Sequence, residues 1–471
     1  MTQPTPTTPG RRATQRGSRL NLTTLLAIVL PILCAVALVL VRPSDAPDTA
    51  AAPTLTPLTR STVVCPSGMD GAPEVSVTST TEDVRGQVRV GLGGDTKDAR
   101  VVSGEATSVD AGEGPVAVYG EDETAPGLAA ARFGADRPAV ATCLAPAPHA
   151  WFTGVGAGAG HTSVLELTNP DSGTAVADVT VYGRSGVVDA PRLRGISVTG
   201  GSSVQLDLAS IVPRRDELAI QVVAARGRIG ASVLDRYDPL GNGATMSDWL
   251  PPQSDPATSN LLMGIAPGAG ARRTLVVANG GLDEVRATVQ VVTEQSVFTP
   301  KDVPDLRIPP ESAGRIDLSG ALAKILAKGG VTGLQITANE PVTASLRTRA
   351  GGDLSHAVPD PTVDGPSTVL LPPSGNDAKR TLLLAGATGA GTVDVVARTA
   401  SGKEVHSEKV DVTADRGITV QLPAGAELVS VTPTGTTING AVLLVDNGAA
   451  IVPLTMPVLN GLVPAVRPGL P

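Results

Sequence analysis

The chain has 471 residues, of which 41% are hydrophobic, but only eight are aromatic and four are histidine. Its 45 acidic residues outnumber its 37 basic ones, and no basic stripe is interleaved with aromatic residues, so nucleic-acid binding has no support. The hydrophobic content is too high for a wholly disordered chain, and 53 glycines with 40 prolines break long helices and favour strands joined by frequent turns.

The N-terminus combines a basic tail with a long apolar run. Residues 1–19 carry four arginines and no acidic residue, and we expect them to form a disordered cytoplasmic tail. Residues 20–41 have no charge, and as a transmembrane helix they would cover roughly 33 Å, enough for a hydrocarbon core of ~30 Å. The arginines before this run predict that the N-terminus is cytoplasmic and the rest extracytoplasmic. A cleaved signal peptide is the alternative, although its apolar region usually has about 7–15 residues.

The next segment, residues 42–60, is rich in proline, alanine and threonine. This composition predicts a stiff, extended spacer, which at ~3.1 Å per residue would reach up to roughly 55 Å. We therefore expect the remainder of the chain to be an ectodomain held away from the membrane.

Two alternating strands around a turn recur along the rest of the chain. Copies begin at Pro73, Thr162, Arg273 and Arg380. Period-two alternation interrupted by turns every ~8–12 residues is typical of an all-β sandwich, so we predict about four tandem immunoglobulin-like β-sandwich units. The predicted units are residues 61–153, 154–263, 264–371 and 372–471. One short helix is expected from Ser319 to Lys328, with Gly329 at its C-terminal cap.

The segment from Gly154 to Gly160 alternates glycine with small residues and precedes His161, a pattern that at first sight resembles a phosphate-binding loop. A dinucleotide fingerprint needs a third glycine where this sequence has Ala159, and it needs a helix after the loop. The segment has the same place in the repeat as "GIAPGAG" and "PPSGND" further along. We therefore interpret it as a connector between units and expect no nucleotide there.

Cys65 and Cys143 are the two cysteines beyond the apolar run, near the two ends of the first unit. In an oxidising compartment we expect them to form a disulfide, which would contribute roughly 4 kcal/mol by closing a long loop. Two separate buried thiols are the alternative.

Three aromatic residues are candidate partner contacts because they lie close to the expected joints between units. Trp151 and Phe152 precede the glycine-rich segment, and Trp249 lies near the second joint. If exposed, they would be candidate hot spots of a binding surface. The alternative, which we favour, is that they wedge neighbouring sandwiches together.

Catalytic and metal-binding patterns are weak. The histidines are isolated, and the motifs HExxH, GxSxG and a partnered SxxK do not occur. A metal pair of His149 and His161 has little support. Asp235, Asp238 and Asn242 offer oxygen ligands, but without EF-hand spacing they are better explained as a hairpin turn than as a calcium site. We expect no catalytic residues, no cofactor and no metal.

The text most specific to a family is "LTNPDSGTAVADVTVYGRSGVVDAPRLRGISVTGGSSVQLDLASIVP", residues 167–213. With the basic tail, the single apolar run and the long Ala/Val/Gly/Pro-rich remainder, the chain resembles an uncharacterised family of membrane-anchored extracytoplasmic proteins of actinobacteria. Genes of this family often lie close to a cell-envelope glycosyltransferase gene, so the resemblance implies a role in the envelope and a membrane glycosyltransferase as a partner. It assigns no catalytic residues.

Taken together, the sequence favours a non-enzymatic, single-pass membrane protein whose ectodomain is a scaffold or binds an envelope protein. The alternative is a polysaccharide-binding or polysaccharide-modifying ectodomain. A sugar-binding groove would gather Trp151, Trp249 or Tyr182 on one exposed face, whereas burial of all three would favour the scaffold.

Overall fold

The computed structural model describes residues 22–40, 53–241, 243–253, 255–373 and 378–463. By their contacts these residues divide into two compact units, of which the larger is Thr56–Gly461. The smaller unit combines the N-terminal residues up to Leu55 with those from Leu462 onward. A two-stranded sheet pairs β1 (Thr54–Pro57) with β35 (Asn460–Val463).

The apolar run near the N-terminus contains helix α1 (Leu22–Leu40), which includes Pro31. The large apolar side chains described on this helix are 41–78% exposed. Among the residues that the structure describes, no helix has both the length and the apolar character needed to cross a membrane. The sequence predicts a transmembrane helix over 20–41, and residues 20, 21 and 41 of that range lie outside the described residues. The same is true of the predicted tail, 1–19, and of the spacer up to residue 52.

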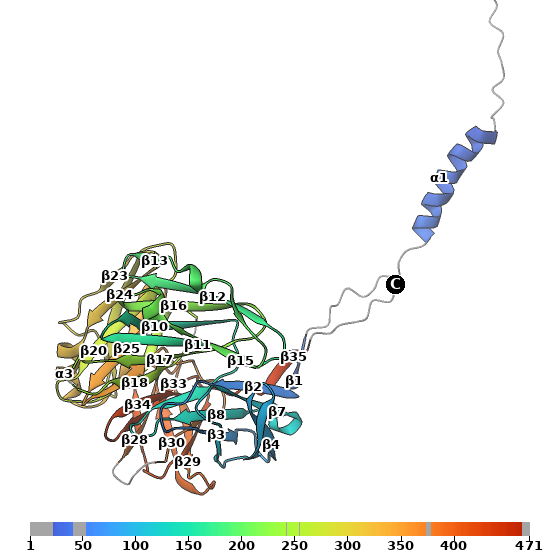
Figure 1. Ribbon diagram of the computed structural model, residues 1–471. Helices are drawn as coiled ribbons and strands as arrows, with labels where there is room; N and C mark the ends of the chain where they lie inside the picture. Colours follow the sequence, from blue (N-terminus) through green and yellow to red (C-terminus); the bar gives the residue numbers. More distant parts are fainter. Residues whose placement is uncertain (1–21, 41–52, 242, 254, 374–377, 464–471) are drawn as a thin grey trace, which may run out of the picture. The chain divides into compact units, whose positions relative to one another are not determined.

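The fold is all-β, as predicted (Figure 1). It repeats one strand order. In each of four successive segments, the first strand pairs with the sixth, the sixth with the third and the third with the fourth. A second group of strands has the order fifth, second, seventh, eighth. In the second and third segments the fourth strand is divided in two, and in the third the long β25 serves as both sixth and seventh.

The first and second segments contain the following elements. The first has β2 (Arg60–Cys65), β3 (Glu74–Ser79), β4 (Arg85–Leu92), β5 (Asp95–Val102), β6 (Thr107–Asp110), β7 (Val116–Glu121), β8 (Leu128–Phe133) and β9 (Val140–Cys143). The second has β10 (His149–Gly158), β11 (His161–Asn169), β12 (Ala175–Gly183), β13 (Gly186–Val188), β14 (Ile196–Val198), β15 (Ser202–Asp207), α2 (Leu208–Ile211), β16 (Arg215–Arg226), β17 (Gly230–Tyr237) and β18 (Met246–Leu250).

The third and fourth segments continue the pattern. The third has β19 (Ala257–Met263), β20 (Arg272–Asn279), β21 (Val285–Thr293), β22 (Val297–Phe298), β23 (Leu306–Ile308), β24 (Ser312–Asp317), α3 (Ser319–Leu326), β25 (Val331–Ala350) and β26 (Asp353–Ala357). The fourth has β27 (Ser367–Leu370), β28 (Lys379–Ala385), β29 (Gly391–Arg398), β30 (Glu404–Val412), β31 (Ile418–Leu422), β32 (Leu428–Thr434), β33 (Asn439–Val445) and β34 (Ala449–Pro453).

Alternation in the sequence explains how these strands form the core. In β21, the side chains of Val285, Ala287, Val289 and Val291 are buried while the residues between them face outward. Period-two burial of this kind is expected where a strand has one face toward a core and one toward solvent. The predicted short helix is confirmed as α3, which buries Leu322 and is followed by Gly329 at a φ of 77°.

The predicted disulfide between Cys65 and Cys143 is confirmed. Cys65 ends β2 and Cys143 ends β9, so the bond links the first and last strands of the first segment. Both residues belong to the core of this segment, together with Val75 and Val118.

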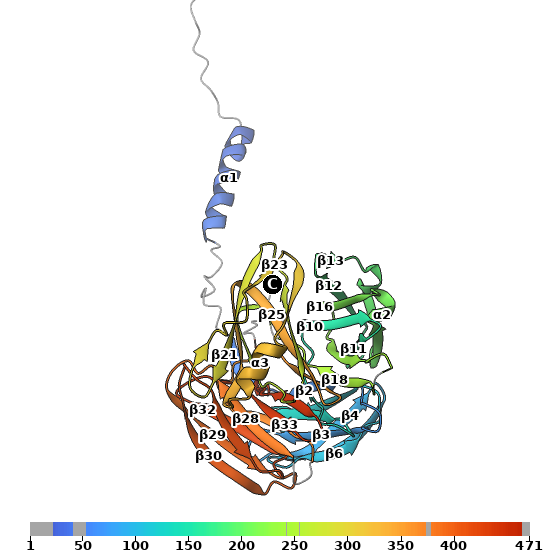
Figure 2. The ribbon, with the colours of Figure 1, turned by 90° about the vertical axis from the view of Figure 1, so that its left-hand side faces the viewer.

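The segments also pack against one another, and the first contacts the fourth (Figure 2). Arg137 donates to the carbonyl oxygen of Asn447 at 2.8 Å, and Asn447 donates to that of Asp136 at 2.7 Å. One hydrophobic cluster includes Ala131 and Val140 of the first segment together with residues of the fourth. The region from Thr56 to Gly461 thus forms one compact unit.

Unit boundaries are predicted at residues 154, 264 and 372, and strand pairing adds detail to this prediction. Strand β10 spans residue 154, and β19 and β27 end before residues 264 and 372. Each of the three pairs with a strand that follows it: β16, β25 and β32. A division by strand pairing would therefore fall one strand earlier than the predicted boundaries.

Candidate functional site

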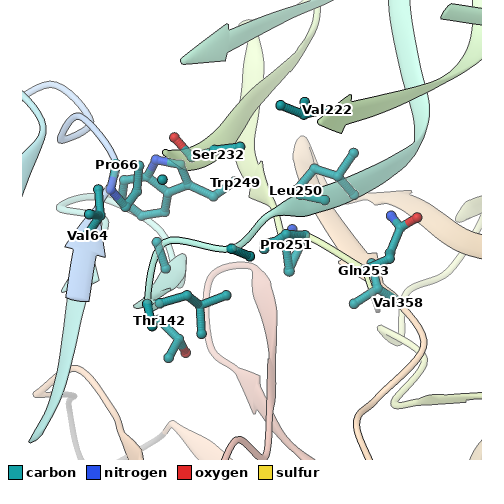
Figure 3. A pocket seen from close by; sticks show the side chains of 18 of the residues that line it. Val64, Pro66, Thr142, Val222, Ser232, Trp249, Leu250, Pro251, Gln253 and Val358 are labelled. Carbon is teal, nitrogen blue, oxygen red and sulfur yellow. The ribbon is translucent and has the colours of Figure 1, made fainter. Parts of the chain in front are cut away.

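An apolar cavity of about 420 Å³ lies where the four segments meet (Figure 3). Each segment contributes to its wall: Val64 from the first, Val222 from the second, Val358 from the third and Pro453 from the fourth. Most of the remaining lining is alanine, proline and other apolar side chains. A concave, mostly apolar volume of this size is typical of a site for a small molecule or an inserted side chain.

Few polar groups face this cavity. Gln253 Oε1 accepts hydrogen bonds from the hydroxyls of Thr153 and Thr343, at 2.6 and 3.2 Å. Gln253 Nε2 is buried and has no hydrogen-bond partner among the described residues. At the rim, His149 Nε2 lies 2.6 Å from an oxygen of the exposed Asp255. The cavity can therefore take a mostly apolar group.

Trp151, a candidate partner contact, is only 3% exposed. Its ring stacks on that of Tyr182, with centroids 5.2 Å apart, and it packs against Val276 and Ala278 of the third segment. Gly280 leaves room for the indole, since a β-carbon there would come within 2.7 Å of it. Trp151 therefore wedges the second segment against the third, as in the interpretation that we favour from the sequence.

The other two candidate contacts are buried as well. Phe152 is 0% exposed and belongs to the core of the second segment, because successive side chains on β10 point to opposite faces. Trp249 is 4% exposed, packs against Ala139 and Ala141, and donates from Nε1 to the carbonyl oxygen of Ser67 at 3.2 Å. It joins the second segment to the first. The described structure thus presents none of the three as an exposed contact.

The glycine-rich segment is not a connector, and that prediction is wrong. Residues up to Gly158 belong to β10, which pairs with β16, and the turn to β11 falls at Ala159 and Gly160. The glycines make room for neighbours: a β-carbon on Gly156 would collide with the ring of His161. Gly154 has a φ of 91°, and a β-carbon there would lie 2.7 Å from Ser345 Oγ of the third segment.

Beneath this segment lies a buried polar network centred on Asp235, which is 0% exposed. Ser163 Oγ donates to its Oδ1 at 2.5 Å, and His161 Nε2 lies 2.9 Å from the same oxygen. His356 of the third segment reaches the second oxygen, at 3.3 Å. Asp235 therefore sits in a strand at the joint of two segments, and the hairpin-turn interpretation is wrong for it. Asn242, named with it in the sequence, lies outside the described residues.

Arg347 of the third segment extends the network. Its Nη2 donates to Glu217 Oε1 at 2.8 Å, and its Nη1 donates to the carbonyl oxygen of Gly154 at 3.2 Å. Nη1 also lies 3.0 Å from His161 Nε2. A guanidinium, two carboxylates and two imidazoles thus partner one another at this joint, as buried charges require.

The electrostatics of the network follow from burial and neighbouring charges. Burial alone would raise the pKa of Asp235, but the charge of His161 and the hydrogen bonds with His161 and His356 outweigh it, so the pKa lies well below its usual range. Burial lowers the pKa of His356; Asp235 opposes this change, and Arg347 adds to it. Asp235 is therefore ionised in the folded protein at neutral pH.

The geometry indicates that this network positions the second and third segments against each other. Ser163 and His161 both bind Asp235, so the hydroxyl is not hydrogen-bonded to an imidazole as a serine nucleophile would be. The structure also separates the two histidines considered as a metal pair, since His149 pairs with Asp255 and His161 with Asp235. Among the described residues, no group of three or more His, Cys, Asp or Glu side chains is arranged to hold a metal ion.

The sequence signal for the Asp235 network is a position at which the second segment departs from the repeat. The third and fourth segments have a buried arginine, Arg273 and Arg380, at the place on the second strand that Ser163 occupies in β11. Each arginine donates to backbone carbonyl oxygens of its own neighbourhood. In the second segment, Ser163 stands where the other two segments have an arginine. Asp235 lies opposite Ser163 and is paired with His356 of the third segment.

A second carboxyl near the joint, Asp248, makes the stability depend on pH. Burial, followed by the nearby carboxylate of Asp353, raises the pKa of Asp248 well above its ordinary value. Because the folded pKa exceeds the unfolded one, its favourable contribution is complete below about pH 4 and is lost as the pH rises. We expect the unfolding free energy of Asp248→Asn to increase relative to that of wild type as the pH rises, by up to about 1.4 kcal/mol per pH unit.

Denaturant unfolding of both proteins between pH 4 and 8 measures this difference. Asp394→Asn, at a partly exposed aspartate, is the control for the loss of one negative charge. A constant difference between Asp248→Asn and wild type over this range would contradict the expected ionisation.

Comparison with known protein families identifies a match over the middle of the chain. A family described as a family of unknown function (DUF5719) matches residues 129–423, from β8 to just beyond β31. This range is more than half of the chain and includes the glycine-rich segment, Trp151, Asp235 and Arg347. No curated protein matches the chain.

Proposed function

The chain belongs to the DUF5719 family of unknown function, and from this premise we propose that it is a non-enzymatic, membrane-anchored protein whose ectodomain is a scaffold for an envelope partner. The observation that carries the proposal is the use of its scarce aromatic residues. Trp151, Trp249 and Tyr182 are all buried, and the two tryptophans lie at joints between segments. An aromatic sugar-binding groove would need them exposed.

Rigid joints suit a scaffold because they fix the relative positions of distant surface residues. Between the second and third segments the joint contains Trp151, Arg347 and the Asp235 network. The repeated strand order supports four immunoglobulin-like sandwiches, since the second–fifth and third–sixth pairings also occur in immunoglobulin constant domains. The pairing of first and sixth strands is a feature of this chain.

An extracytoplasmic location is supported by the disulfide and by the charge pattern of the N-terminus. The Cys65–Cys143 bond fits an oxidising compartment. Arg11, Arg12, Arg16 and Arg19 precede the apolar run at residues 20–41, and the described part of that run exposes its large apolar side chains. The actinobacterial family resemblance adds a membrane glycosyltransferase as the first candidate partner.

Protease treatment of intact cells that express the full chain with a tag at each end tests the topology. We expect the N-terminal tag to be protected and the C-terminal tag to be digested, because only the tail before the apolar run would be cytoplasmic. A protected C-terminal tag, or recovery of the protein free in the medium, would contradict the anchor. Cross-linking of the same full chain in membranes, followed by identification of the captured proteins, tests the partner role.

A further inference from the structure

A second, charged pocket of about 340 Å³ lies between the second and third segments, on the solvent side of the Asp235 network. Four arginines of the third segment line it: Arg315 from β24, Arg272 from β20, and Arg347 and Arg349 from β25. These three strands are neighbours in one sheet, so the arginines share a single platform. The second segment covers it with His161, Asp216, Glu217 and Tyr237.

Strand register places two like charges side by side on this platform. Arg272 of β20 lies directly opposite Arg349 of β25, and Thr274 lies opposite Arg347. Residues two apart on a strand share a face, so all four point to the same side of the sheet. Like charges directly opposite each other destabilise a sheet. The pair therefore costs stability unless a negative charge lies between or above the two guanidinium groups.

Three carboxylates line the pocket with the arginines: Asp216, Glu217 and Asp317. Glu217 accepts a hydrogen bond from Arg347 at 2.8 Å and lies 3.7 Å from Arg315. Asp317 accepts a hydrogen bond from the backbone of Ser319 at 2.8 Å. Its pKa is lowered mainly by hydrogen bonds with the side chain and backbone of Ser319, and further by the charges of Arg272 and Arg315. Within the described part of the chain, no hydrogen-bond or ion-pair partner is assigned to the guanidinium of Arg272 or Arg349.

The remaining contacts hold the platform in place. The guanidinium of Arg349 lies 3.6 Å from the ring centre of Tyr237, a cation–π contact that orients it without neutralising it. Arg347 is buried and anchored on Glu217 and on the carbonyl oxygen of Gly154. Its Nε is buried and has no partner among the described residues. The pocket is thus a preformed array of donors in which four guanidinium groups outnumber three carboxylates.

We propose that this pocket binds a phosphate monoester, held between Arg272 and Arg349. A phosphate monoester carries a charge of about −1.5 to −2 at neutral pH and three strong acceptor oxygens. Arginine forks bind phosphate oxygens bidentately, so these oxygens can accept from Arg272 and Arg349 together. A carboxylate has two oxygens, which a single fork occupies. The pocket is larger than a phosphate group, and Asp216 and Thr274 on its wall offer acceptors for the hydroxyls of a phosphorylated sugar or polyol.

Calorimetric titration of the full-length protein at pH 7.5 tests the proposal, with inorganic phosphate and glucose 1-phosphate as probes and sodium acetate at equal ionic strength as the reference. We expect saturable binding of both phosphates and a rise in melting temperature that acetate does not produce. If either of the two phosphates failed to bind saturably, the proposal would be overturned. Equal binding of acetate would overturn it as well.

Variants locate the site. Arg272→Ala and Arg349→Ala are each expected to weaken phosphate binding at least tenfold, whereas the control Arg286→Ala, an exposed arginine on β21 of the same segment, stays within twofold of wild type. Without phosphate, Arg272→Ala should melt at the same temperature as wild type or higher, because it relieves the like-charge pair. This measurement separates a lost site from a misfolded protein. Equal weakening by Arg286→Ala would place the binding elsewhere and overturn the assignment.

Discussion

Replacing Asp235 with alanine is expected to lower the free energy of unfolding by about 3–5 kcal/mol, the range for breaking a buried ion pair from one side. The carboxylate is fully buried, is hydrogen-bonded to Ser163 and His161, and lies at ion-pair distance from His356. Its removal leaves the Ser163 hydroxyl and the His161 imidazole without their acceptor, and His356 without its nearby carboxylate, in a place that water does not reach. Denaturant-induced unfolding of the full-length protein measures the loss.

A matched control keeps this expectation specific to burial. Asp189 is an exposed aspartate of the same segment, paired at the surface with Arg194. Asp189→Ala is expected to change the unfolding free energy by less than about 1 kcal/mol, since exposed ion pairs contribute little. If Asp235→Ala cost no more than Asp189→Ala, the network would not be what holds the second and third segments together.

Trp151→Ala is the second large effect, expected to cost about 3–5 kcal/mol, as truncation of a large buried aromatic side chain usually does. The indole fills the space between Tyr182, on its own segment, and Val276 and Ala278 on the next. The substitution would leave a cavity at the joint and would also remove the stacked ring pair. Denaturant unfolding gives the magnitude.

Phe298→Ala is the control for Trp151, because Phe298 is an aromatic residue of the third segment that is 38% exposed. It should cost less than about 1.5 kcal/mol, in keeping with its partial burial. If Trp151→Ala destabilised the protein no more than Phe298→Ala, the indole would not be a wedge between segments.

The sequence predicts the strands, the repeat, helix α3 and the disulfide because these depend on local patterns. Period-two alternation decides which side of a strand is buried, and the two cysteines fall at the first and last strands of one segment. The aromatic residues near the joints indicate where segments would meet, although their burial becomes visible only in three dimensions.

The sequence does not predict the sites at the joints, for physical reasons. The run from Gly154 to Gly160 has a composition typical of a loop. Its glycines lie so close to His161 and Ser345 that a β-carbon would not fit. Asp235 stands beside turn residues, and nothing local shows that its partner His356 is 121 positions away on another segment. The arginines of the charged pocket come together only through the register of β20, β24 and β25.

Hydrogen exchange in the peptide Trp151–Gly158 of the full-length protein tests the central claim, that buried joints unite the segments into one body. The account predicts slow exchange, because this stretch belongs to β10, pairs with β16 and lies under the third segment. The hairpin turn at Ala159 and Gly160 should exchange quickly and serves as an internal reference. Exchange of Trp151–Gly158 as fast as that of the turn would show a flexible connector between independent units and would contradict the account.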